Sequence, residues 1–142
     1  MMFQTTTAWR VASALVVMLL LNGCAASRTT ACRPGEEFAV QDALYFGTGI
    51  PDDGVVTPED WSMFLTATVT PRFPQGLTVS QASGQWRGED GSIVQETSYV
   101  LELVHPDDVM SEQAVAEIIS AYKTQFRQEA VLRVKHESCI SF

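Results

Sequence analysis

Near its start the chain has an apolar run. After this run, apolar residues recur either at every second position, as in strands, or at every third to fourth position, as in helices. Residues 11–21 form an apolar run with one polar residue, Ser13, but a helix that spans a bilayer core needs about 20 such residues. Arg10 precedes this run and Gly23 follows it, an arrangement typical of an export signal. We therefore predict that residues 1–23 are a signal peptide rather than a transmembrane helix.

Beyond the leader, alternation of apolar and polar residues predicts strands. The four segments are 38–46, 77–86, 93–104 and 130–142. The first has one exception, because Asp42 falls on its otherwise apolar face. In the last segment, we assign Leu132, Val134, Ile140 and Phe142 to the face that packs on the core.

Two further segments predict helices. The first begins at Thr57, a capping residue, with Pro58 at the first helical position and Asp60 three residues after the cap. The second covers residues 109–128 and carries an apolar stripe at helical spacing. The stripe consists of Val115, Ile118, Ile119, Tyr122 and Phe126.

The resulting order is βαββαβ. It predicts an α+β, ferredoxin-like domain over residues 37–142, with a four-stranded antiparallel sheet and two helices on one face. In that topology the last strand lies antiparallel to the first. The end of the chain is therefore expected near the start of the first strand.

The three cysteines are assigned different roles. Cys24 directly follows Leu21-Asn22-Gly23, a segment that resembles the lipobox of bacterial lipoproteins. The resemblance implies cleavage before Cys24 and acyl chains on its sulfur. Ala25 stands where inner-membrane lipoproteins often have Asp, so we expect an outer-membrane anchor on the periplasmic side. Residues 24–36 are small and polar, and we interpret them as a lipidated tether.

The other two cysteines are expected to pair. An exported domain meets an oxidising compartment, where thiols form disulfides. Cys32 precedes the first strand and Cys139 lies at the end of the last. The predicted topology brings these two ends together, so the disulfide and the fold support each other.

Charge and motifs exclude several functions. The chain carries a net charge of −8 and has no basic run, so a nucleic-acid partner is not expected. It has no Gly-x-Ser-x-Gly motif, and His105 and His136 fit no zinc spacing. We predict no catalytic residues, no metal and no cofactor.

One face of the predicted sheet has no helix over it. By strand parity it carries aromatic and charged side chains: Tyr45, Trp86, Glu96, Glu102, Arg133 and Lys135. Such a mixture suits a surface that binds a partner or a second copy; an ordinary solvated face is the alternative. Arg72 lies between two prolines. It is expected either to bind a ligand or to brace Glu96 or another internal acid.

Several segments resemble a family of small exported bacterial proteins and lipoproteins, the domain-of-unknown-function 3574 family. The most specific is Pro71-Arg72-Phe73-Pro74-Gln75-Gly76-Leu77-Thr78-Val79. The others are Leu44-Tyr45-Phe46-Gly47, Trp61 with Phe64, Gly84-Gln85-Trp86, Tyr122 with residues 126–132, and Cys139-Ile140-Ser141-Phe142. The resemblance implies no activity and no catalytic residues.

Two hypotheses for function follow. The first is a non-catalytic envelope lipoprotein that binds another envelope protein, since the chain combines an anchor with no catalytic motif. The second is a small-molecule-binding protein or enzyme of the dimeric α/β-barrel kind. It pairs two open sheet faces around a cavity near Tyr45, Trp86, Glu96 and Glu102, and its only support is analogy of fold.

The lipid anchor can be tested by Cys24→Ser. Each buried methylene contributes roughly 0.8 kcal/mol to membrane binding, so two or three acyl chains hold a protein stably. We expect the wild-type protein in the membrane fraction, with acyl mass on an N-terminal Cys24, and loss of both in the variant. Mass spectrometry that finds an unmodified N-terminus upstream of residue 24 in the wild type contradicts this prediction.

Overall fold

A computed structural model describes residues 31–142 except positions 53 and 89. The predicted signal peptide and Cys24 lie outside the described residues. The main sheet contains β1 (Glu37–Gly47), β4 (Thr78–Arg87), β5 (Ile93–His105) and β6 (Leu132–Ile140). Within the described part of the chain, no helix is long and apolar enough to cross a membrane.

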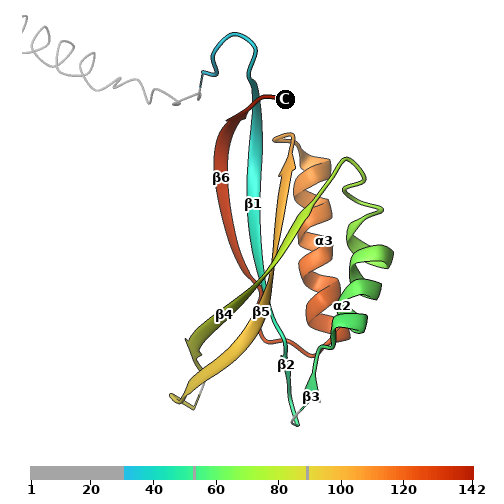
Figure 1. Cartoon of the computed structure of the whole chain (residues 1–142), viewed down its shortest axis with the longest axis vertical. Helices are drawn as coiled ribbons and strands as arrows, with labels where there is room; N and C mark the ends of the chain where they lie inside the picture. Colours follow the sequence, from blue (N-terminus) through green and yellow to red (C-terminus); the bar gives the residue numbers. More distant parts are fainter. Residues whose placement is uncertain (1–30, 53, 89) are drawn as a thin grey trace, which may run out of the picture.

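The sheet has the predicted ferredoxin-like topology. Its strand order is β4-β5-β1-β6, and each neighbouring pair is antiparallel. The helices α2 (Pro58–Phe64) and α3 (Val109–Gln125) both lie on one side of the sheet (Figure 1). β1 lies between β5 and β6, so side chains of β1 contact both neighbouring strands and the helical layer.

The start of α2 follows from its sequence. The Oγ1 atom of Thr57 accepts a hydrogen bond from the Asp60 N–H at 3.1 Å. The Asp60 carboxylate in turn accepts from the Thr57 N–H at 3.1 Å. This capping box confirms the predicted helix start. The helix continues into a π-helical segment, η1 (Leu65–Val69), in which the Thr70 N–H donates to the Leu65 carbonyl at 2.9 Å.

Aromatic rings form the centre of the core between sheet and helices. The ring centroids of Phe46 and Tyr122 lie 4.6 Å apart. Those of Trp61 and Tyr99 lie 4.5 Å apart in parallel planes. Burial of such a side chain contributes roughly 2–3 kcal/mol, and favourable ring geometry adds about 1 kcal/mol. The periodicity that predicted these elements therefore also identified their buried faces.

The predicted core face of β6 is wrong. The register pairs Leu44 with Arg133 and Asp42 with Lys135, so both basic side chains lie on the helix-covered face. Leu132 lies on the open face and is 60% exposed. The physical reason is Asp42 on β1, because a buried carboxylate is very costly unless a cation accompanies it.

One loop and one helix end differ from the sequence prediction. Residues 47–54, predicted as a loop, include a small hairpin of β2 (Gly49–Ile50) and β3 (Gly54–Val55). The helix α3 ends at Gln125 rather than at residue 128, because Arg127 adopts a positive φ of 53°. This early end turns residues 127–130 toward the sheet edge.

The predicted disulfide is present. Cys32 and Cys139 form a bridge across a sequence separation of 107 residues. Cys139 on β6 lies opposite Phe38 on β1. The bridge thus joins the segment before β1 to the end of β6, at the end of the sheet where the predicted tether meets the domain.

Removal of the bridge should destabilise the domain. For a loop of this length, loss of the constraint on the unfolded chain costs up to about 5 kcal/mol. We expect the Cys32→Ser/Cys139→Ser variant to show a lower free energy of unfolding in urea. Cys24→Ser is the matched control and should unfold like the wild type. A double variant as stable as the control contradicts the prediction.

Candidate functional site

Two polar features distinguish the two faces of the sheet. A network of charged side chains lies on the helix-covered face, around Asp42. A pocket lies on the open face, beside Tyr45 and Trp86. The network sets the orientation of β6, which forms one wall of the pocket.

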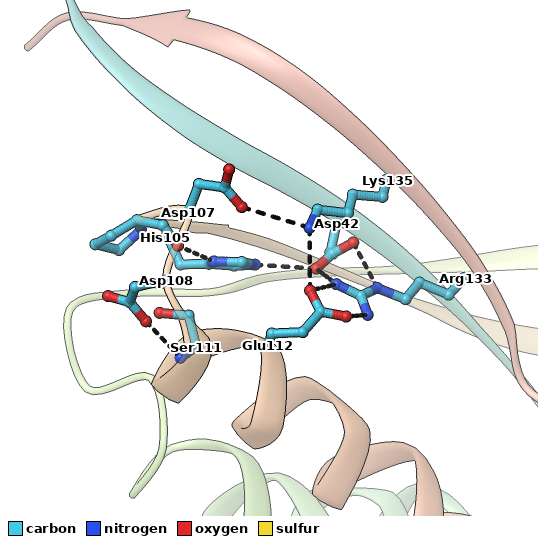
Figure 2. Close-up of polar contacts among 9 residues, drawn as sticks. Asp42, His105, Asp107, Asp108, Ser111, Glu112, Arg133 and Lys135 are labelled. Carbon is cyan, nitrogen blue, oxygen red and sulfur yellow. Dashed lines mark hydrogen bonds and ion pairs between the residues drawn. The ribbon is translucent and has the colours of Figure 1, made fainter.

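Asp42 is 0% exposed and accepts hydrogen bonds from two neighbouring strands. Arg133 on β6 donates from Nε to Oδ1 at 2.8 Å and from Nη2 to Oδ2 at 2.6 Å. His105 on β5 donates from Nε2 to Oδ2 at 2.9 Å. Figure 2 shows the carboxylate between the imidazole and the guanidinium. The forked Arg133 pair satisfies both carboxylate oxygens, as bidentate geometry allows.

The network extends to α3 through Glu112 in its first turn. Arg133 donates from Nη2 to Glu112 Oε2 at 2.9 Å, and Lys135 donates from Nζ to the same atom at 3.0 Å. Lys135 also lies 3.6 Å from Asp107. One guanidinium therefore connects β1, β6 and α3 (Figure 2).

These contacts keep the acids ionised. Burial raises the pKa of Asp42, but hydrogen bonds from Arg133 and His105 outweigh it, so the net pKa is lowered. Hydrogen bonds from Arg133 and Lys135 lower the pKa of Glu112 to about 2. The network is therefore a set of charges in place at neutral pH.

The geometry of the network fits a stabilising role. The Nδ1 atom of His105 lies 2.8 Å from the Pro106 carbonyl oxygen, and Nε2 lies 2.9 Å from Asp42. Both ring nitrogens are thus engaged, and the side chain is 3% exposed. A general base needs a nitrogen within reach of substrate, so His105 is not placed for catalysis.

The pocket on the open face has a volume of about 520 Å³. Its walls come from β1, the β4–β5 hairpin, the start of β6 and two loops. Its lining includes Tyr45, Trp86, Val94, Glu96, Arg127 and Leu132. Tyr45 and Trp86 are 38% and 42% exposed, so aromatic surface faces the opening.

Glu96 supplies a fixed carboxylate in this pocket. Its Oε2 atom accepts a hydrogen bond from the Gly49 N–H at 3.1 Å. Gly47 leaves the space that the carboxylate occupies, because a Cβ there would lie 2.6 Å from Glu96 Oε1. Tyr122 donates from its hydroxyl to the Gly47 carbonyl at 2.9 Å. Burial, and then the charge of Glu96, raise the pKa of Tyr122.

The turn after α3 forms the rim. Arg127 donates to Asp52 Oδ2 at 3.2 Å and to the Pro51 carbonyl at 3.0 Å. Gln128 donates from Nε2 to the Gly49 carbonyl. These bonds fasten the loop after β1 to the turn before β6, and both segments line the pocket.

Of the predicted surface residues, three meet in the pocket: Tyr45, Trp86 and Glu96. Glu102 shares the open face but lies outside the pocket lining. Arg133 lies on the opposite face, so its predicted position is wrong. Arg72 braces an acid, but that acid is Glu117 on α3, at 3.1 Å, rather than Glu96.

Sequence reasoning missed the part of the site that loops contribute. Arg127 and Gln128 had no signal beyond their place near a helix end. The glycines at 47 and 49 did provide one, since glycine directly after a strand allows close approach of another group. Across residues 31–142, apart from positions 53 and 89, no cluster of His, Cys, Asp and Glu is arranged to hold a metal.

The chain belongs to the family described as "Protein of unknown function (DUF3574)", whose model matches residues 41–142. No curated protein sequence matches the chain significantly. The family match confirms the resemblance that the sequence segments indicated. It transfers no activity to the chain.

Two solved structures align with the chain. A phage SAM lyase in complex with S-methyl-5′-thioadenosine aligns with a TM-score of 0.56 and 16% identity. The alignment covers 73% of this chain and 90% of the lyase. CutA from Synechococcus elongatus aligns with a TM-score of 0.49 and 9% identity, over 75% of this chain and 81% of CutA. The lyase likeness supports the α+β architecture alone.

The network can be tested with Asp42→Asn. Removal of one partner from a buried ion pair costs about 3 kcal/mol at neutral pH. Because the folded-state pKa of Asp42 is lowered, its stabilisation is present above the unfolded value near 3.8 and is lost as pH falls further. We therefore expect the difference from wild type in urea unfolding to shrink below about pH 4.

Glu117→Gln is the matched control, since it removes an acid from an exposed ion pair with Arg72. Exposed pairs contribute little, so this variant should remain close to wild type at every pH. Equal effects of the two substitutions, or an Asp42→Asn effect that does not change with pH, would contradict the role assigned to Asp42.

Proposed function

We propose that this member of the DUF3574 family is a non-catalytic, envelope-anchored module that binds a small organic ligand in its open-face pocket. The observation that carries the proposal is the meeting of Tyr45, Trp86 and Glu96, from three strands, around one cavity. The function of a fold resides in such a site rather than in the fold itself.

The pocket has the properties of a ligand site. Its volume of about 520 Å³ falls within the range of small-molecule pockets, which combine apolar walls with a few fixed polar groups. Tyr45, Trp86 and Leu132 supply apolar surface, while Glu96 and Arg127 supply charge. Hydrogen bonds to Gly49 and Pro51 hold these charged groups in place.

The lining supports binding rather than turnover. Among the described residues that form it, Ser98 has a hydroxyl, but histidine and cysteine are absent. Nucleophilic catalysis pairs a nucleophile with a base. The buried Asp42–His105 pair is on the opposite face and has no free ring nitrogen.

The proposed tether leads into β1 at Glu37, and the pocket lies near the other end of this strand. The proposed lipid sits on Cys24, and the chain from Cys24 to Phe38 reaches at most about 50 Å. β1 has 11 residues, which extend roughly 35 Å. Tyr45 lies near the end of β1 that is distant from the tether (Figure 1). The pocket thus lies at the end of β1 farther from the proposed tether, a position that suits ligands in the periplasm.

A dimer that pairs two open faces is the second candidate. The exposed apolar side chains of Val104 and Leu132 on that face favour it. A second copy laid across the sheet would cover the mouth of the pocket. The walls of the pocket, however, all come from one chain, so ligand binding does not require the second copy. An envelope protein is the other partner that this face suits.

Ligand-observed NMR tests the binding function. The acylated protein in phosphatidylcholine nanodiscs is screened against a library of small aromatic compounds, which includes S-methyl-5′-thioadenosine, with empty nanodiscs as the blank. We expect binders whose affinity falls at least about tenfold in Trp86→Ala, since truncation of a central aromatic contact costs more than about 1 kcal/mol.

Val104→Ala is the matched control, because Val104 is exposed on the same face but is not part of the pocket lining. It should leave the affinities unchanged. A screen without binders, or binders that are insensitive to Trp86→Ala, would sink the proposed function.

A further inference from the structure

The pocket contains acids without cations of their own. Glu96 and Glu129 both line it, and among the described residues neither forms an ion pair. Arg127 is the basic residue in the lining, and it pairs with Asp52 on the rim. The lining thus carries two negative charges and one positive charge, and that positive charge is already paired with Asp52.

Glu96 differs from Asp42 in the partners that the chain supplies to its carboxylate. The chain supplies Arg133 and His105 to the buried carboxylate of Asp42. Glu96 is half-buried, yet its carboxylate accepts its hydrogen bond from a backbone N–H, that of Gly49. A carboxylate removed from water gains most from a positive charge. Glu96 therefore has the electrostatic requirement that Asp42 has already met within the chain.

The neighbours of Glu96 suit a positive charge on an organic group. Tyr45 and Trp86 line the same cavity, and the face of an aromatic ring attracts ammonium groups, most strongly for Trp. Aromatic rings combined with an acid form the usual recognition site for quaternary and protonated amines. The apolar side chains of Ile50, Val94 and Leu132 provide a surface for the rest of the ligand.

We infer that the pocket selects small organic cations, in which a protonated amine or quaternary ammonium faces Glu96 and an apolar body contacts Tyr45 and Trp86. This inference rests on the proposed binding function and specifies its ligand class. A carboxylate fixed by Gly49, in the space that Gly47 leaves open, supplies the charge selectivity.

Calorimetry with a matched pair of probes tests the charge selectivity. The probes are 2-phenylethylammonium and the uncharged 2-phenylethanol, titrated at pH 7 into the acylated protein in phosphatidylcholine nanodiscs. We expect the cation to bind about tenfold more tightly than the alcohol. In Glu96→Gln this ratio should fall to about one, while the affinity for the alcohol stays unchanged.

Glu102→Gln is the matched control, because it removes the same charge from the same face of β5 outside the pocket. It should keep the wild-type ratio. Gly47→Ala provides a second route, since its Cβ would displace the Glu96 carboxylate, and it should lower the ratio as Glu96→Gln does.

The outcomes separate the two proposals. Equal affinity for both probes, with both lost in Trp86→Ala, leaves the binding function standing and overturns the cation inference. A ratio that persists in Glu96→Gln, or falls equally in Glu102→Gln, also overturns it. Failure of both probes to bind overturns the cation inference, whereas the aromatic-compound screen decides the binding function.

Discussion

The burial of one carboxylate in the central strand constrains much of this structure. Asp42 has no exposed surface, and its cost of desolvation is met by Arg133 from β6 and His105 from β5. Arg133 also bonds Glu112 at the start of α3. A single charge on β1 is therefore bonded to the neighbouring strand on each side and, through Arg133, to the helix above.

That constraint also shapes the open face. Side chains alternate between the two faces of a strand, so placing Arg133 and Lys135 toward the helices turns Leu132 outward. Leu132 then lines the pocket beside Tyr45. The turn between α3 and β6 contains Arg127 and Gln128. These side chains donate hydrogen bonds to the carbonyls of Pro51 and Gly49 in the loop after β1. The network on the helix-covered face thus orients β6, and the opposite face of β6 forms part of the pocket.

Asp42 and Glu96 are acids in two contrasting environments. Asp42 is enclosed by Arg133 and His105, whose hydrogen bonds lower its pKa and connect three strands of the sheet. Glu96 is positioned by the Gly49 backbone beside exposed aromatic surface, in a cavity of about 520 Å³. The first acid is satisfied within the chain, whereas the second can be satisfied by a ligand. This difference in electrostatic environment separates the structural residue from the proposed binding residue.

The sequence alone determined the order of the elements and the cap at Thr57, because periodicity and capping are local properties. It also indicated the disulfide between Cys32 and Cys139, because the βαββαβ order brings the two ends of the domain together. It also identified Tyr45, Trp86 and Glu96 as residues of one face. Only the tertiary structure decided the orientation of β6. Leu132 and its apolar neighbours predicted one core face by hydrophobicity, but the requirement of Asp42 for a cation turned Arg133 inward instead. That requirement depends on a residue 91 positions away in the chain, so no local pattern could reveal it.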